Sequence, residues 1–247
     1  MNQNPSFKAR IVSIVTSNSK QFKSFFVDKE YLIFSKAFQT NSYYILKTDE
    51  DNYNHLTGIP FNDPALFFKK CINGILTEND ISFVKKGQTE GEVKGSIRRK
   101  ISALPLIINI FQSTSLVEEN FSKNRIRCSF AIGQTDFTIG FTITKGQSTR
   151  SMTLLKGNEV DPSLAKPMDL VLSRNKGEKL FHQHVFGDIK ILNNYLQSVK
   201  NIIDIENFKE PIIIEALNNL QKEMSGEAKK EGIKDETDVQ ELLDKEK

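Results

Sequence analysis

Three patterns of apolar residues predict an α+β protein. Near the N-terminus, apolar residues recur at three- and four-residue spacing, which marks one face of an amphipathic helix: Ile11, Ile14, Val15, Phe22, Phe25 and Phe26. In the middle, Phe137, Ile139, Phe141 and Ile143 alternate with threonine and glycine, as in a strand. Helical spacing returns after Asp188. We therefore expect N-terminal helices and a hairpin, a central antiparallel sheet, and C-terminal helices.

The first third of the chain is expected to hold a β-hairpin followed by a helix. Residues Glu30 to Phe34 and Ser42 to Thr48 are rich in Tyr, Ile, Leu and Phe, which favour strands. Asp63 is a good N-cap residue and Pro64 suits the first helical position. Glycine is common at the position just after the last helical turn, so the helix is expected to end at Gly74.

The remaining strands are expected to form an antiparallel meander around Phe137–Ile143. Their segments are Arg127 to Ile132, Ser148 to Leu155, Met168 to Leu172 and Lys179 to Val185. Before them, residues Lys85 to Lys94 are expected to form a loop. Helical spacing then runs from Ile97 to Phe111, and Pro105 either kinks this helix or starts a new one.

The chain divides into three expected parts. Residues 1–187 form an α+β domain, residues 188–225 a helical segment packed on it, and residues 226–247 a charged, mobile tail. From Lys222 onward there are six lysines and nine acidic residues, a net charge of −3. Since the chain of 247 residues carries +3, the body before the tail carries +6. A moderately basic body suits a polyanionic partner.

Composition argues against several classes of protein. No apolar run is long enough to cross a bilayer, and the N-terminus lacks the basic segment followed by an apolar segment that is typical of a signal peptide. Two cysteines, Cys71 and Cys128, are too few for a disulfide framework or a cysteine-rich zinc site. We expect a cytoplasmic protein with buried thiols.

The segment Tyr53-Asn54-His55-Leu56-Thr57-Gly58-Ile59 is the first candidate site. It is expected to form a polar corner between the hairpin and the Asp63 helix. An imidazole can exchange protons near neutral pH, so His55 suits an acid or base, and Thr57 can orient the ring or a phosphate. The alternative is structural: His55 would hydrogen-bond a backbone carbonyl at the strand end.

This region resembles a known family. A strand running into His-Leu-Thr-Gly-Ile is followed by Leu66-Phe67-Phe68 and then by Cys71-x-x-Gly74-x-Leu76-x-x-x-Asp80-Ile81. The order and spacing are similar to the mobile-element nucleases related to barnase, EndoU, colicin E5/D and RelE, and most similar to the fourth phage-borne family. The resemblance is best from Leu32 to Leu104 and extends to Phe186. It implies RNA cleavage without a metal ion, by attack of the ribose 2′-hydroxyl.

Two basic segments offer a cation for the phosphate. Arg98, Arg99 and Lys100 stand together, and the resemblance points to Lys100 as catalytic and to the two arginines as substrate contacts. Arg150 can bind phosphate in a bidentate manner, and Ser151 can donate a hydrogen bond to it. The alternatives are a solvated helix face for the first segment and an ordinary strand edge for the second.

His182 and His184 are placed to share a face of a strand. Such a pair can bind zinc or copper, but no third ligand is evident nearby apart from a guess at Asp188, so we expect no metal and no cofactor. A catalytic role for one of these histidines stays open.

The leading hypothesis is a toxin-like, metal-independent endoribonuclease of a phage or mobile element, with RNA as substrate. His55, Lys100, Arg150 and Ser151 would be catalytic, and a cognate antitoxin or a host protein is a further partner. The main alternative is a non-enzymatic protein on the same scaffold that inhibits a host defence protein. A third is a structural protein that binds partners through its C-terminal helices. Sequence patterns leave the RNA target, the protein partner and the oligomeric state open.

Overall fold

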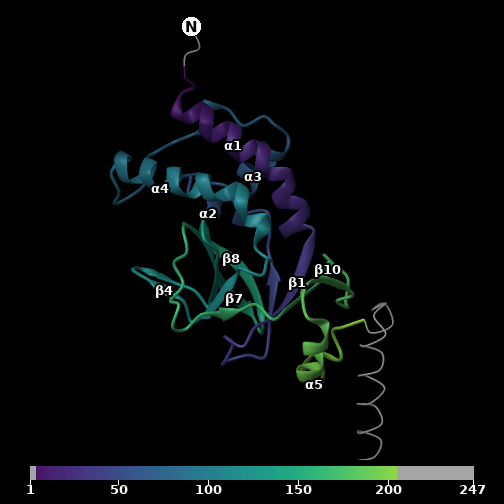
Figure 1. Cartoon of the computed structure of the whole chain (residues 1–247). Coiled ribbons are helices and arrows are strands. Elements are labelled where there is room, and N and C mark those ends of the chain that lie inside the picture. The colour runs from purple at the N-terminus through teal and green to yellow at the C-terminus, as the bar shows by residue number, and fades with distance from the viewer. Residues whose placement is uncertain (1–3, 205–247) are drawn as a thin grey trace, which may run out of the picture.

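A mixed sheet of nine strands lies beneath four N-terminal helices (Figure 1). The computed structural model describes residues 4–204. The strand order is β11-β10-β1-β2-β8-β7-β6-β3-β9, and β4 and β5 form a separate ribbon. The predicted α+β class is confirmed. The strands are β1 Lys29–Phe34, β2 Tyr44–Lys47, β3 Leu116–Glu119, β4 Ser122–Lys123, β5 Ile126–Arg127, β6 Phe130–Gly133, β7 Phe137–Lys145, β8 Ser148–Lys156, β9 Lys166–Pro167, β10 Leu170–Asn175 and β11 Gln183–Gly187.

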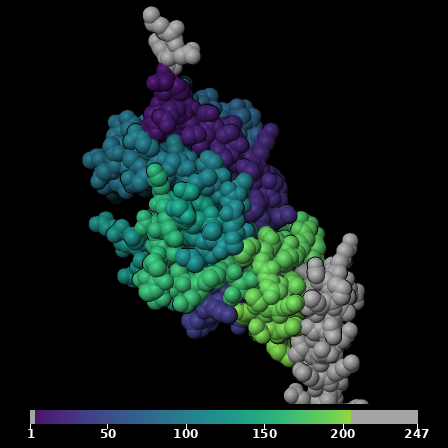
Figure 2. Space-filling model, viewed as in Figure 1, coloured from purple at the N-terminus to yellow at the C-terminus, as the bar shows by residue number. Residues whose placement is uncertain are grey.

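Helices α1–α4 gather at one end of the molecule, above the sheet, whereas α5 lies toward the opposite end (Figure 1). In the space-filling view, this N-terminal part, in purple and blue, forms the upper end of the surface (Figure 2). The α-helices are α1 Phe7–Phe22, α2 Asn52–Thr57, α3 Pro64–Ile72, α4 Glu90–Ala103 and α5 Leu196–Val199. A π-helical turn, η1, covers Lys23–Val27, and 3-10 turns cover Glu78–Asp80 (η2), Leu104–Asn109 (η3) and Ile189–Asn194 (η4).

The structure contains two helices that the sequence patterns predicted, α1 and α3. Ile11 and Val15 are completely buried on the inner face of α1. The Asp63 carboxylate accepts a hydrogen bond from the amide of Leu66, and Pro64 is the first residue of α3. Gly74 follows with φ of +67°, a backbone conformation that glycine adopts without strain. The predicted β1–β2 hairpin is also present.

Two strands do not lie where a simple meander would place them. β6, β7 and β8 are consecutive antiparallel neighbours, as expected, but β10 and β11 lie on the far side of β1. β1 has apolar side chains on both faces, Tyr31 and Ile33 on one and Leu32 and Phe34 on the other, all buried. A strand buried on both faces belongs in the middle of a sheet, so β10 pairs with its free edge.

The sheet is also not entirely antiparallel. β2 and β8 run parallel, with Ile45 opposite Ser148 and Leu46 opposite Thr149. Because β2 leads directly into α2, this pairing places α2 against β8, and α4 packs on the same strand. The parallel pair therefore determines which part of the sheet the His55 segment covers.

Two helices begin in segments expected to be irregular. Residues 52–57 form α2 rather than a corner, because Asn52 accepts a hydrogen bond from the Asp49 amide and opens a helical turn. α4 begins at Glu90, inside the expected loop. There the Thr89 side chain accepts from the amide of Glu92, and the Glu92 carboxylate accepts from the amide of Thr89, a capping box.

Apolar side chains form three clusters. The largest lies between α1–α4 and the sheet, and a second packs residues 189–203 on the other face of β1 and β10. A third, around Phe121, Cys128 and Ala131, covers the outer face of β6. Within the described residues, the helical segment expected after Asp188 consists of two short elements, η4 and α5.

Some expectations concern residues that the structure does not describe. The helices expected beyond Asp204 and the charged tail 226–247 lie outside the described residues. No described helix is both long and apolar enough to cross a membrane.

Candidate active site

Helix α2 presents the His55 side chain to solvent. Tyr53 and Leu56 of this helix are completely buried. The Tyr53 hydroxyl donates a hydrogen bond to the carbonyl oxygen of Val15 in α1 at 2.6 Å. With these side chains fixed in the core, the face that carries His55 is turned outward, where the side chain is exposed. Among residues 4–204, nothing hydrogen-bonds the imidazole ring, which is accessible to a ligand.

Lys100 reaches α2 from the neighbouring helix α4. Its ammonium group donates a hydrogen bond to the carbonyl oxygen of His55 at 2.9 Å. Its aliphatic stem passes over Gly58, where an added Cβ would lie 2.8 Å from Cδ of Lys100. Gly58 has φ of +69° and ends α2. Glycine is needed at this position both for the turn and for the close approach of the lysine stem.

His55, Lys85 and Lys100 line one cavity of about 310 Å³. The remaining lining residues are Asn54, Gly58, Ile59, Pro60, Phe61 and Met152, so the lining contains no carboxylate. Burial, and to a smaller degree the positive charge of Lys85, lowers the pKa of Lys100 to about 8. Two ammonium groups that repel each other in a cavity without carboxylates make a site that favours an anion.

Arg150 does not share this cavity, contrary to expectation. Strand β8 contains a bulge: Thr153 pairs with Gly140 and Ser151 with Phe141, so Met152 is the extra residue and turns toward the cavity. Arg150 pairs with Thr142, whose hydroxyl faces Cys128 in the cluster on the outer face of the sheet. Arg150 therefore lies on the sheet face opposite the helices.

The two hydroxyl groups expected to assist are buried. The Thr57 hydroxyl donates to the carbonyl oxygen of Asn54 at 2.8 Å and accepts from the amide of Ile59. Both contacts stabilise the end of α2. Ser151 is 1% exposed, and its hydroxyl has no hydrogen-bond partner among the described residues. Neither side chain lines the cavity.

Arg98 and Arg99 also point elsewhere. Their side chains are exposed on α4, and neither lines the cavity. The Arg98 guanidinium lies over the Phe7 ring of α1, 5.1 Å from its centre. Of the three consecutive basic residues, only Lys100 lies on the side of α4 that meets α2.

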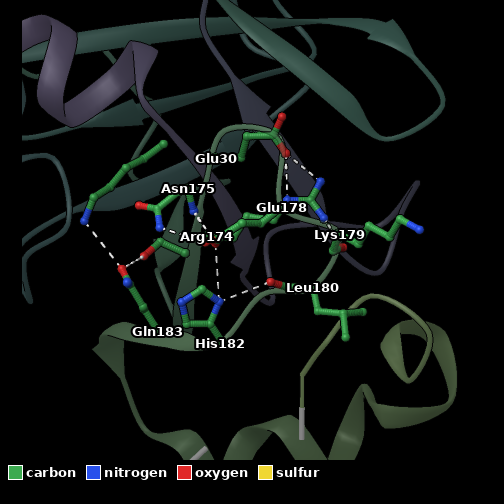
Figure 3. Close-up of polar contacts among 10 residues, drawn as sticks. Glu30, Arg174, Asn175, Glu178, Lys179, Leu180, His182 and Gln183 are labelled. Carbon is green, nitrogen blue, oxygen red and sulfur yellow. Dashed lines mark hydrogen bonds and ion pairs between the residues drawn. The ribbon is translucent and has the colours of Figure 1, made fainter. Parts of the chain in front are cut away.

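His182 lies in the turn that connects β10 with β11 (Figure 3), and His184 lies in β11. The Nδ1 atom of His182 lies 3.3 Å from the Leu180 carbonyl oxygen and 3.5 Å from the Glu178 carboxylate. The Nε2 atom of His184 lies 2.9 Å from the Gly187 carbonyl oxygen. Within the described part of the chain, no group of three or more His, Cys, Asp or Glu side chains is placed to hold a metal ion.

Lys85 and Met152 line the cavity although the sequence analysis did not propose a role for either. Lys85 begins a tight turn in which the Gln88 amide donates to its carbonyl oxygen and Gly87 has φ of +75°. The Lys-Lys-Gly pattern signals the turn but not which lysine faces α2. Met152 turns inward only because of the bulge, which no alternation pattern reveals.

A comparison with protein-family models identifies the relatives of this chain. The model described as phage-Barnase-EndoU-ColicinE5/D-RelE like nuclease4 matches residues 14–210. The chain belongs to this family. The match covers α2, the Lys85 turn, α4 and β8, so the whole cavity lies within the part of the chain that defines this phage-associated nuclease family. The resemblance read from the sequence is confirmed. No curated protein and no solved structure gave a significant match.

Proposed function

We propose that the cavity of His55, Lys85 and Lys100 is the active site of an endoribonuclease that uses the 2′-hydroxyl of its substrate. The observation that supports this most is the lining itself, with two lysines and a histidine and no carboxylate. A scissile phosphate placed between Lys85 and Lys100 would relieve their repulsion. As negative charge develops on the pentavalent phosphorus, both lysines would stabilise it.

His55 supplies the proton-transfer group of this proposal. In the first step the 2′-oxygen bonds to phosphorus, its proton passes to a base, and the bond from phosphorus to the 5′-oxygen breaks. An acid gives a proton to the departing 5′-oxygen, and the product carries a 2′,3′-cyclic phosphate. The exposed ring of His55 can take either role. The cationic lining disfavours a divalent metal ion, which prefers oxygen ligands.

The test is cleavage of RNA by the purified full chain in the presence of EDTA. We expect cyclic-phosphate ends on the products and no cleavage of DNA, which lacks the 2′-hydroxyl. His55→Ala should lower kcat/KM by about 10²-fold, the usual effect of removing an acid–base group. Its melting temperature should stay the same, because the ring is exposed and makes no hydrogen bond with the described residues.

His184→Ala is the matched control, since it removes another exposed imidazole, from β11. This control should cleave RNA like the wild type. If it lost activity while His55→Ala kept it, the site would lie at β11 instead. Equal cleavage of DNA would contradict the 2′-hydroxyl route. A protein that cuts no host RNA but captures one host protein in stoichiometric amount, unaffected by His55→Ala, would support the inhibitor alternative.

A further inference from the structure

Two larger hollows adjoin the proposed active-site cavity. The first, of about 410 Å³, shares Pro60 and Phe61 with the cavity. The second, of about 840 Å³, shares Ser82 and Val84 with the first hollow. It also shares Lys85 with the cavity itself. The shared lining residues place the three spaces beside one another, in a row along residues 82–85 toward the N-terminal end of α1, and this row is called the groove below.

Cations and aromatic rings alternate at the far end of this groove. The rings of Phe7 and Phe83 stack with their centres 5.7 Å apart. The ammonium groups of Lys8 and Lys94 lie 5.7 Å and 4.8 Å from the centre of the Phe83 ring. Arg98 covers the Phe7 ring from α4. Aromatic side chains combined with basic ones are typical of surfaces that bind single-stranded nucleic acid.

Val84 lies where the two hollows meet and is 84% exposed. An aliphatic side chain so exposed contributes nothing to the core, but it offers apolar contact to a base. The adjacent Phe83 is half-buried, so part of its ring faces the groove. Apolar side chains therefore occur in all three spaces, whereas the lysines line the cavity and the far hollow, and the lining of the middle hollow contains none.

The carboxylates along the groove are already engaged. Glu90 pairs with Lys94 at 2.5 Å, Asp80 pairs with Lys70, and Glu78 accepts a hydrogen bond from the Ser6 hydroxyl. The lysine partners partly neutralise the charges of Glu90 and Asp80, whereas Glu78 keeps its charge. Lys8 and Lys85 remain as the cations best placed to meet phosphates.

We propose that this groove binds several nucleotides of single-stranded RNA on one side of the scissile phosphate. Phosphates lie at Lys85 and Lys8, and unstacked bases contact Val84 and Phe83. The inference rests on the proposed function, since it takes RNA as the occupant of the cavity. A double helix does not fit this arrangement, because its bases are stacked inside and cannot reach an apolar floor.

The test measures binding to His55→Ala protein, in which cleavage of the RNA during the measurement should be about 10²-fold slower. We expect a labelled single strand of about 12 nucleotides to bind at least tenfold more tightly than a trinucleotide, because only the longer strand fills the groove. Val84→Glu, which places a negative charge on the groove floor, should weaken binding of the long strand by about tenfold. Ile75→Glu is the matched control: Ile75 is 60% exposed and lines none of the three spaces, so binding should not change.

Salt dependence gives a second measurement. Lys8→Ala should reduce the slope of log affinity against log salt by about 0.7, the value for one phosphate contact on a single strand. Lys20→Ala, from the exposed surface at the other end of the same helix, should leave the slope unchanged.

The outcomes separate this inference from the proposed function. If the wild type cuts RNA but Val84→Glu and Ile75→Glu bind the long strand equally well, the proposal that the groove binds RNA is refuted. The proposed nuclease function is then unaffected. If the long strand binds as predicted but the wild type cuts no RNA, RNA binding by the groove is supported and the nuclease proposal is refuted. Equally tight binding of duplex RNA would refute the single-strand occupant.

Discussion

Lys100 combines a structural contact with the charge on which the proposed function depends. It donates a hydrogen bond to the last turn of α2 and lines the cavity beside His55. Burial lowers its pKa to about 8, so the ammonium form is lost near the upper end of the physiological range. A lysine is charged below its pKa, and the lowered value therefore shortens the pH range over which it can stabilise a phosphate.

This predicts an alkaline fall in activity. For the wild type, kcat/KM should decrease as pH rises through about 8, because that parameter reports ionisations of the free enzyme. Lys100→Arg should move the fall to higher pH, since a guanidinium stays protonated. Lys100→Met should lower kcat/KM at every pH and remove this fall.

Lys20→Arg, at an exposed site on α1, is the control and should leave the pH profile unchanged. A wild-type profile that stays flat up to pH values near the ordinary pKa of lysine would contradict a catalytic role for the Lys100 charge.

At the scale of single residues, the sequence indicated part of the cavity. The position of His55 between strand and helix, and the basic run ending at Lys100, were enough to suggest both residues. Arg150 was misplaced because a strand pattern gives alternation but not which face meets the helices. Lys85 was missed because two adjacent lysines in a turn are equivalent in sequence, and only the turn geometry distinguishes them.

Among the secondary-structure elements, β1 and β10 are held together by a buried ion pair (Figure 3). Nε of Arg174 donates to the Glu30 carboxylate at 2.7 Å, and the side chain of Arg174 is 9% exposed. The guanidinium also donates to the Lys179 carbonyl oxygen and lies 4.2 Å from the centre of the Phe181 ring. The backbone amide of Phe181 donates a hydrogen bond to the carbonyl oxygen of Ile202. The contacts of Arg174 and Phe181 therefore connect β1, the β10–β11 turn and the last described segment.

Arg174→Met should therefore destabilise the protein strongly. Removing Arg174 leaves the buried Glu30 carboxylate with only the half-exposed Lys47, 3.4 Å away, as its counter-charge. The loss should therefore lie near the lower end of the about 3–5 kcal/mol that breaking a buried ion pair costs. Denaturant unfolding monitored by circular dichroism measures this loss. Lys176→Met is the control: Lys176 pairs with Asp49 at 2.8 Å, but the two side chains are 50% and 71% exposed.

An exposed pair contributes about 0–1 kcal/mol, so the control should unfold almost like the wild type. Equal losses for the two variants would show that the Arg174 contacts do not hold the elements together.

How well an element could be predicted depended on local signals. α3 followed from Asp63, Pro64 and Gly74, because caps and turn residues act on their immediate neighbours. α2 was not predicted, since its six residues are too few to show a helical period. It is stabilised by contacts with α1, α4 and β8 that are distant in sequence.

For the molecule as a whole, the strand order decides where the site forms. The parallel pairing of β2 with β8 places α2 over β8, and α4 covers the same strand. The Lys85 turn, immediately before α4, closes the cavity. The sequence predicted the class of fold but not this order, because pairing between distant strands is set by which faces of β1 and β8 must be buried.

The central claim is that a cavity assembled from distant segments is a phosphate site. Lys85→Ala compared with Lys86→Ala tests it most directly, because both variants lose one lysine from the same turn but only Lys85 lines the cavity. We expect Lys85→Ala to lower kcat/KM for RNA cleavage by about 10²-fold, as for other groups that stabilise transition-state charge. Lys86→Ala should change it by less than about threefold, through net charge alone. Equal losses, or a larger loss for Lys86→Ala, would contradict the assignment of this cavity as the active site.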